Sequence, residues 1–167
     1  RGVDPTGIVR VMRGLSHGGW DRTDPANGNT HVYTLVLGSQ TLHATGLGMS
    51  LVFDGKCGTG DVERDTAVVV YYGDGASSQG DVHEAMVFAA SYHTPQLFFL
   101  QNNQWAISVP VSTQAKVPLS RRGAGYGIPS VQIDGNDVLA SYAVTRKLLD
   151  DARGGGGPQA IEAFTYR

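Results

Sequence analysis

The sequence predicts an α/β fold, in which a doubly wound and mostly parallel β-sheet has helices on both faces. Residues 67–72 and 96–101 are short apolar runs rich in β-branched and aromatic residues, the composition of strands covered on both faces. Between them, residues 80–93 place apolar side chains at the spacing of an α-helix. Strands that alternate with helices of this length are typical of parallel β-α-β units.

The segments before residue 67 are predicted from their end signals and their composition. Asp4 is a good helix cap and is followed by proline, which suits a first turn, so a short helix is expected from there to about residue 13. Residues 14–29 are rich in Gly, Asp, Pro and Asn and should form a loop. The β-prone residues 32–37 are expected to form a strand, and residues 40–53 have the length and apolar spacing of a helix.

The segments after the second apolar run continue the alternation. The expected elements are a strand at 130–134, a capped helix at 137–152, a glycine break at 154–157 and a last strand at 160–164. The helix at 80–93 has apolar residues on more than one face, which predicts that it packs on the sheet and on a second element. All 167 residues are assigned to a single domain, which is long enough to bury a substantial core.

The composition excludes several classes of protein. Lys and Arg number 13 against 15 Asp and Glu, and no charged run gives an electrostatic footprint for nucleic acid or an anionic membrane. The apolar runs are far shorter than the roughly 18 residues of a spanning helix, and no secretory signal is visible, so a cytoplasmic protein is expected. Cys57 is the only cysteine, which excludes an internal disulfide. Both ends are interpreted as truncated, because no initiator Met is present and the last strand has no closing turn.

Polar groups follow the two central strands at the point where each strand ends. Gly73-Asp74-Gly75 comes directly after the first and Asn102-Asn103 after the second. Because parallel strands have their carboxyl ends on the same side of a sheet, Asp74 and Asn103 should share an edge. Carboxylate and amide oxygens are hard ligands of the kind that Mg²⁺ or Ca²⁺ prefers. The glycine turn and helix start after Asp74 also offer N–H groups to an anion.

Simpler interpretations exist for each motif alone. Asp-Gly between two β-runs signals a hairpin, but the segment that follows has helical spacing. Asn-Asn by itself usually marks a loop or a local hydrogen-bonding turn. The two motifs together, with 26 residues between Gly75 and Asn102, are much more specific.

This combination matches the thiamine diphosphate and Mg²⁺ motif, and its surroundings resemble the alpha subunit of 2-oxo acid dehydrogenase first components. The resemblance is carried by GDGASSQGDVHEAMVFAASY (73–92) and FFLQNNQWAISVP (98–110). It extends to LVLGSQTLHATGLGMSLVF (35–53), VQIDGNDVLASYAVTRKLL (131–149) and IEAFTYR (161–167). The chain is most similar to bacterial branched-chain 2-oxo acid dehydrogenase alpha chains, with pyruvate dehydrogenase alpha chains next. The fold implied is the thiamine diphosphate-binding fold.

The resemblance assigns a metal site and a diphosphate site. The side chains of Asp74 and Asn103 and the backbone carbonyl of Trp105, which stands where the family usually has Tyr, would bind Mg²⁺. The backbone N–H groups of Gly75 and Ala76 would contact the diphosphate.

Five other positions receive roles in the same way. Main-chain groups of Leu35 and Leu37 would hold the aminopyrimidine ring, and Ile107 would be an apolar wedge beneath the bent cofactor. Ser39 and Gln40 match positions that bind K⁺ in some members of the family. No catalytic residue is assigned within this chain.

The activity implied is oxidative decarboxylation of a 2-oxo acid, with branched-chain substrates preferred and the acyl group transferred to a lipoyl group on an acyltransferase core. The site would lie between this chain and a beta subunit, in an assembly of two alpha and two beta subunits. The beta subunit would supply the glutamate that starts proton removal from the cofactor, so the isolated chain is expected to be inactive. Gln101 departs from the Arg of some branched-chain members. An upstream Tyr-Arg pair and a His-bearing loop that relatives carry after the equivalent of Tyr166 lie outside the sequence.

Three alternatives stay open at this point. The chain could be a pyruvate dehydrogenase alpha subunit, since the substrate pocket would be shared with another chain. It could be a non-catalytic fragment that keeps the fold and an interface but binds the cofactor poorly. A dinucleotide-binding module is weaker, because no G-x-G-x-x-G follows a strand.

Overall fold

The computed structural model describes residues 3–15, 18–31 and 34–166. Its contacts divide the chain into two compact units, Arg1–Val36 and Leu37–Arg167. The first unit contains helix α1 (Pro5–Met12) and the 3₁₀ turn η1 (Pro25–Asn27). Asp4 caps α1 through its side-chain oxygen, as expected from the sequence. That residues 1–167 form a single domain stays a prediction.

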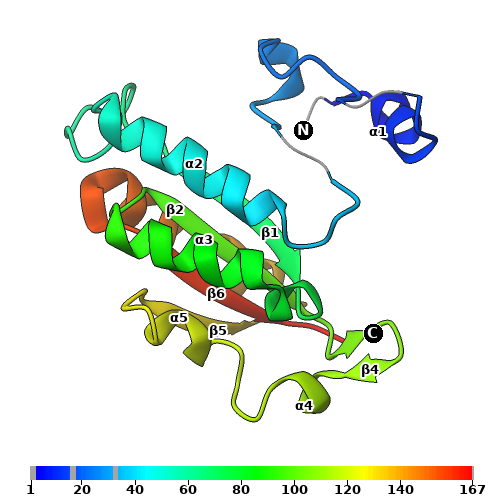
Figure 1. The fold of residues 1–167 in the computed structure, drawn as a ribbon. Helices are drawn as coiled ribbons and strands as arrows, with labels where there is room; N and C mark the ends of the chain where they lie inside the picture. Colours follow the sequence, from blue (N-terminus) through cyan, green and yellow to red (C-terminus); the bar gives the residue numbers. More distant parts are fainter. Residues whose placement is uncertain (1–2, 16–17, 32–33, 167) are drawn as a thin grey trace. The chain divides into compact units, whose positions relative to one another are not determined.

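The second unit is built on a four-stranded parallel sheet with the strand order β1-β2-β6-β5 (Figure 1). The strands are β1 (Val68–Gly73), β2 (Gln96–Asn102), β5 (Ser130–Asp134) and β6 (Gln159–Phe164). The long helices are α2 (Gln40–Phe53), α3 (Gly80–Ser91) and α6 (Val138–Asp151). The α/β fold class is therefore confirmed, and the helix and strand bounds lie within one or two residues of those expected.

Helices cover both faces because the two crossover connections run in opposite directions. Helix α3 connects β1 to its neighbour β2, whereas α6 connects the edge strand β5 back to β6. Since such crossovers are right-handed, opposite directions place the helices on opposite faces. Val82, Ala85 and Met86 of α3 join one core cluster, which includes Phe98 and Leu100 of β2. The other face packs Leu97, Ile161 and Ala163 against α6 residues Val144, Leu148 and Leu149.

Helix α2 is the second element against which α3 was expected to pack. The Thr45 hydroxyl of α2 donates to the Ala85 carbonyl of α3 at 3.3 Å. Two apolar side chains of α3, Val87 and Phe88, nevertheless stay more than 40% exposed. The expectation of a second packing partner is confirmed. The contact with α2 still leaves part of the apolar surface of α3 exposed.

The expectation of a strand at residues 32–37 is wrong for the residues that the structure describes. Val32 and Tyr33 lie outside the described residues, and Thr34–Leu37 form bends and a turn. Leu35, Val36 and Leu37 are between 59% and 65% exposed. A β-prone run becomes a strand only when a neighbouring strand pairs with it.

Several short elements were not anticipated from the sequence. They are the turn η2 (Ala76–Ser78), the hairpin of β3 (Trp105–Ala106) and β4 (Val109–Pro110), and the short helices α4 (Val111–Gln114) and α5 (Arg121–Ala124). The glycine break appears as the irregular turn η3 (Ala152–Gly156), in which Gly155 has a φ of 89°. Such short pieces lack the apolar periodicity that reveals longer elements.

Candidate metal and diphosphate site

The carboxyl ends of β1 and β2 lie side by side. The parallel register pairs Gly73 with Gln101, so the chain leaves both strands at the same edge. Asp74 is the first residue after β1, and Asn103 the first after β2. The two residues that the sequence singled out therefore emerge together.

Asp74 is a buried carboxylate with one oxygen left without a partner. Its side chain belongs to a residue that is only 2% exposed, and no group in the described part of the chain hydrogen-bonds to Oδ2. Burial raises the pKa of the Asp74 carboxyl group, and hydrogen bonds from the backbone N–H groups of Asp74 itself and of Asn103 oppose that rise. The carboxylate therefore lies close to the Asn103 main chain. An unpaired buried carboxylate oxygen is unfavourable unless something binds it.

The loop after Asp74 is held by its own serine and by an arginine from α5. The Ser77 hydroxyl donates to the Asp74 carbonyl at 2.5 Å, and the Ser77 N–H donates to the same oxygen at 3.2 Å. Arg122 donates from Nη1 to the carbonyl and hydroxyl oxygens of Ser77. Among the described residues, no group accepts the N–H groups of Gly75 and Ala76. These two donors remain available at the start of the turn.

Asn103 and Trp105 face one another across a short turn. Asn103 Oδ1 accepts the Trp105 N–H at 3.0 Å, which leaves this oxygen a second lone pair. In the hairpin, Val111 donates its N–H to Gln104, so Trp105 and Pro110 form a non-hydrogen-bonded pair. The backbone of Trp105 therefore points away from β4, and its carbonyl is directed to the side on which Asn103 lies.

The hairpin tip contacts the loop after Asp74. A Cβ on Gly75 would lie 2.8 Å from Cβ of Ala106, so only glycine allows the loop and hairpin to approach this closely. Ile107 at the tip is 85% exposed and has a φ of 57°. A β-branched residue in the left-handed region is a strained conformation, and such strain is concentrated at functional sites.

Leu37 is placed beside this edge, whereas Leu35 is not placed relative to it. Gln40 accepts the Gly38 N–H through Oε1 and donates from Nε2 to the Tyr71 carbonyl of β1, at 3.0 and 2.9 Å. This ties the turn at Leu37 to the last residues of β1. Leu35 belongs to the first unit and is 59% exposed. Ser39, the other position matched to a K⁺ site, directly precedes α2.

Two polar contacts near the edge, one buried and one part-buried, were missed by the sequence analysis. Glu162 of β6 is 2% exposed and accepts a hydrogen bond from the Asn102 side chain at 2.7 Å. Arg122 holds the Ser77 loop from a distant part of the chain. The signal for Glu162 was a charged residue inside an otherwise apolar strand. Arg122 had no comparable signal, because exposed arginines are common.

The other features of the described residues do not point to a second metal site. They contain no group of three or more His, Cys, Asp or Glu residues able to hold a metal, and a site at Asp74 would instead combine a carboxylate with amide and carbonyl oxygens. The open hollow lined by Gln132, Asp134 and Tyr166, of about 470 Å³, lies at the ends of β5 and β6 and does not include Asp74. Of the helices described, none has both the length and the apolar character to span a membrane.

Comparisons with known proteins give the family and agree with the fold. The family model described as "Dehydrogenase E1 component" matches residues 3–167. The alpha subunit of 3-methyl-2-oxobutanoate dehydrogenase from Mycobacterium tuberculosis is 45% identical over the whole chain, which spans 43% of that relative. The alpha subunit of the pyruvate dehydrogenase E1 component from Staphylococcus aureus is 41% identical over 80% of the chain and 34% of its own length.

Solved structures show the same architecture at low identity. A transketolase from Campylobacter jejuni superimposes with a TM-score of 0.68 at 16% identity, covering 84% of this chain and 21% of its own. A putative thiamin diphosphate-dependent enzyme from Mycobacterium smegmatis gives 0.58 at 21% identity, covering 78% and 22%. These neighbours support the α/β fold expected from the resemblance. On the strength of the family model and the 45% identical relative, this chain belongs to the dehydrogenase E1 component family.

Proposed function

We propose that this chain is the part of a 2-oxo acid dehydrogenase alpha subunit that binds thiamine diphosphate and Mg²⁺. The observation that carries the proposal is the buried, unpartnered Oδ2 of Asp74 beside Asn103 at the carboxyl edge of the sheet. A cation bound there would offset the cost of burying that oxygen. The donor set fits Mg²⁺, which prefers hard oxygens and commonly completes its shell with phosphate oxygens.

Each site residue except Leu35, which is not placed relative to the edge, has a proposed role that agrees with its position. Asp74, Asn103 and the carbonyl of Trp105 would hold Mg²⁺, and the N–H groups of Gly75 and Ala76 would bind the diphosphate. The exposed Ile107 would support the cofactor ring from below, with its strained backbone fixing the angle. Main-chain groups of Leu35 and Leu37 would hold the aminopyrimidine, and a K⁺ site at Ser39 and Gln40 is a further part of the proposal.

The activity proposed is oxidative decarboxylation of a 2-oxo acid with acyl transfer to a lipoyl group. Thiamine diphosphate, when bound, supplies the nucleophilic carbon and the electron-accepting ring. The residues of this chain would bind, orient and partly desolvate it. A beta subunit would complete the site in a complex of two alpha and two beta subunits, and a lipoyl-bearing acyltransferase core would receive the acyl group. The enzyme is proposed to be cytoplasmic.

We propose that the enzyme prefers a branched-chain substrate. The branched-chain relative is 45% identical over the whole chain, whereas the pyruvate dehydrogenase relative is 41% identical over 80% of the chain. The test combines the full-length alpha subunit with its beta partner, Mg²⁺ and thiamine diphosphate. We expect CO₂ release from 3-methyl-2-oxobutanoate at a higher kcat/KM than from pyruvate. A reversed preference would make it a pyruvate dehydrogenase, and no release from any 2-oxo acid would contradict the activity.

A non-catalytic role is the second candidate, because the chain spans less than half the length of the curated relatives that it matches. In that case the chain would keep the fold and an interface without holding the cofactor. Calorimetric titration of the 167-residue chain with Mg²⁺ and thiamine diphosphate separates the two. Saturable binding that requires both components would exclude the non-catalytic role.

A further inference from the structure

We propose that Glu162 is a positioning residue, which fixes the Asn102-Asn103 turn and through it the oxygens of the metal site. This inference rests on the proposed function, since it concerns how the site is held in shape. Glu162 would not contact the metal or the cofactor. It would act through Asn102, the residue next to the candidate ligand Asn103.

Glu162 lies in a row of side chains that crosses the sheet. The strand registers place Tyr72, Leu100, Glu162 and Gln132 opposite one another on β1, β2, β6 and β5. Asn102 is two residues beyond Leu100, so it points to the same face one step nearer the carboxyl edge. Glu162 therefore reaches from the centre of the sheet toward the edge at which Asp74 and Asn103 emerge.

Both oxygens of the Glu162 carboxylate accept hydrogen bonds from neutral donors. Oε1 accepts from Nδ2 of Asn102 at 2.7 Å. Oε2 accepts from the Ser120 N–H at 2.8 Å and from Nε2 of Gln132 at 3.1 Å. No cation among the described residues pairs with Glu162. A buried carboxylate held only by neutral donors is costly compared with an apolar side chain, so packing alone does not account for it.

The contact fixes the orientation of the Asn102 amide. A carboxylate only accepts hydrogen bonds, so the NH₂ group must face Glu162. Oδ1 of Asn102 must then face the other way, and there it accepts the Gln104 N–H at 2.9 Å. A backbone N–H only donates, so both contacts require the same orientation of the amide.

The fixed amide supports a turn with an unusual backbone. Gln104 has a φ of 72°, and its side chain donates from Nε2 to the Thr165 carbonyl at 3.1 Å. The Asn102 carbonyl accepts from the N–H and hydroxyl of Thr165, at 2.8 and 3.2 Å. Asn103 lies between these anchored residues. Loss of the Glu162 contact would release the amide of Asn102 and let the turn relax from the shape that directs Asn103 and Trp105.

The test uses Glu162→Gln, Asn102→Asp and the double variant, in the full-length alpha subunit with its beta partner. In Glu162→Gln, either orientation of the new amide sets its NH₂ group against another donor. In Asn102→Asp, two carboxylates face each other. In the double variant, the amide at position 162 donates to the carboxylate at position 102, accepts from Ser120 and Gln132, and leaves an oxygen for Gln104. Every hydrogen bond is restored at unchanged net charge.

Two measurements are made on each variant. Hydrogen exchange of the Gln104 and Trp105 amides is followed without cofactor, relative to amides in the middle of β2. Calorimetry gives the affinity for thiamine diphosphate at saturating Mg²⁺. We expect both single variants to exchange about tenfold faster or more at these two amides and to bind about 10- to 100-fold more weakly, with the double variant within about threefold of the parent.

Gln132→Ala is the matched control, since it removes a donor to Glu162 without touching Asn102. It should change the affinity by less than about threefold. Additive losses in the double variant, or single variants that melt earlier without faster relative exchange at Gln104, would overturn the positioning role. If the parent enzyme binds no cofactor, the proposed function fails, and the exchange data still decide whether Glu162 holds the turn.

Discussion

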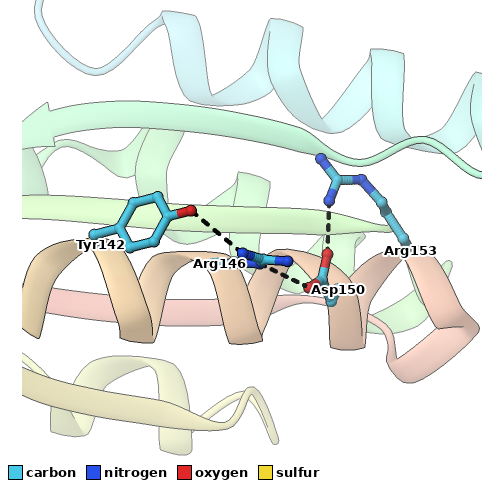
Figure 2. A network of polar contacts seen from close by, with 4 residues as sticks. All are labelled: Tyr142, Arg146, Asp150 and Arg153. Carbon is cyan, nitrogen blue, oxygen red and sulfur yellow. Dashed lines mark hydrogen bonds and ion pairs between the residues drawn. The ribbon is translucent and has the colours of Figure 1, made fainter.

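Asp74 at the carboxyl edge and Asp150 near the end of α6 are carboxylates in opposite surroundings. Asp150 is exposed, with 57% of its side chain accessible, and it pairs with Arg146 at 3.9 Å and Arg153 at 2.9 Å (Figure 2). Asp74 is buried, and its Oδ2 has no partner among the described residues. Exposed ion pairs contribute little to stability, so the well-paired region says little about function. The region with the unsatisfied group is where we propose the metal site.

Glu162 shows that burial alone does not distinguish the surroundings of Asp74 from the rest of the protein. It is as buried as Asp74, yet three donors satisfy its oxygens. A satisfied buried carboxylate organises its neighbours, whereas an unsatisfied one at an edge is poised to bind something. The hydrogen bonds of the two carboxylates therefore support different proposed roles, positioning for Glu162 and metal binding for Asp74.

The largest expected effect is on cofactor binding at Asp74. Asp74→Asn should weaken Mg²⁺-dependent binding of thiamine diphosphate by more than about 100-fold, because it removes the only charged side chain proposed as a metal ligand. Calorimetry on the assembled enzyme measures it. The matched control is Asp150→Asn, which should leave the affinity unchanged. Equal affinity in Asp74→Asn and the parent would remove the basis of the proposed site.

The next effect concerns the close approach at Gly75. Gly75→Ala places a Cβ 2.8 Å from Cβ of Ala106, so the loop and hairpin must move apart. We expect a loss of about 1–3 kcal/mol in the free energy of unfolding, together with weaker cofactor binding. Urea unfolding and calorimetry measure the two quantities.

Gly154, in the turn after α6, provides the control from the other region. A Cβ there meets nothing within 4 Å. Gly154→Ala should therefore be neutral or raise the free energy of unfolding by about 0.4–1 kcal/mol. If the two alanine variants behaved alike, the contrast between a constrained edge and a tolerant surface would be lost.

A smaller effect is the pH dependence of the cofactor-free chain. Burial raises the pKa of Asp74 above its ordinary value of 3.8, so the folded state binds this proton more tightly than the unfolded chain. The resulting stability is fully present below pH 3.8 and is lost as the pH rises through the folded pKa. Asp74→Asn cannot ionise and should not show this loss. Between about pH 4 and 7, the free energy of unfolding of the variant, measured in urea, should rise relative to that of the parent as the pH rises. If the two free energies changed in parallel with pH, the burial of a charged carboxylate at position 74 would be contradicted.

The smallest effect is expected in the exposed network. Asp150→Asn should lower the free energy of unfolding by less than about 1 kcal/mol, since both of its partners are solvated. The difference should shrink in about 1 M salt, where surface charges are screened. A loss of several kcal/mol in chemical unfolding would show that α6 depends on this network.

Much of the fold could be predicted because its signals are local. The apolar runs of β1 and β2, the spacing of α3 and the cap at Asp137 are each visible in a short window of sequence. The β-prone run at 32–37 misled for the same reason, since β-propensity is local whereas strand pairing is not. The shared edge of Asp74 and Asn103 was predictable from topology, because adjacent parallel strands end at the same edge.

The supporting contacts could not be predicted in this way. Glu162 and Asn102 are separated by 60 positions, and Arg122 and Ser77 by 45. Nothing in either local sequence indicates its partner. The left-handed backbone at Gln104 and Ile107 was equally hidden, because residues of these types rarely adopt it.

The sequence by itself determined the layered α/β architecture and the two motifs that end at its carboxyl edge, because periodicity and strand topology follow from neighbouring residues and the handedness of the chain. Only the tertiary structure decided which buried carboxylate is satisfied and which is not. The physical reason is that hydrogen-bond satisfaction depends on side chains brought together from distant segments, here β6, α5 and the loops after β1 and β2.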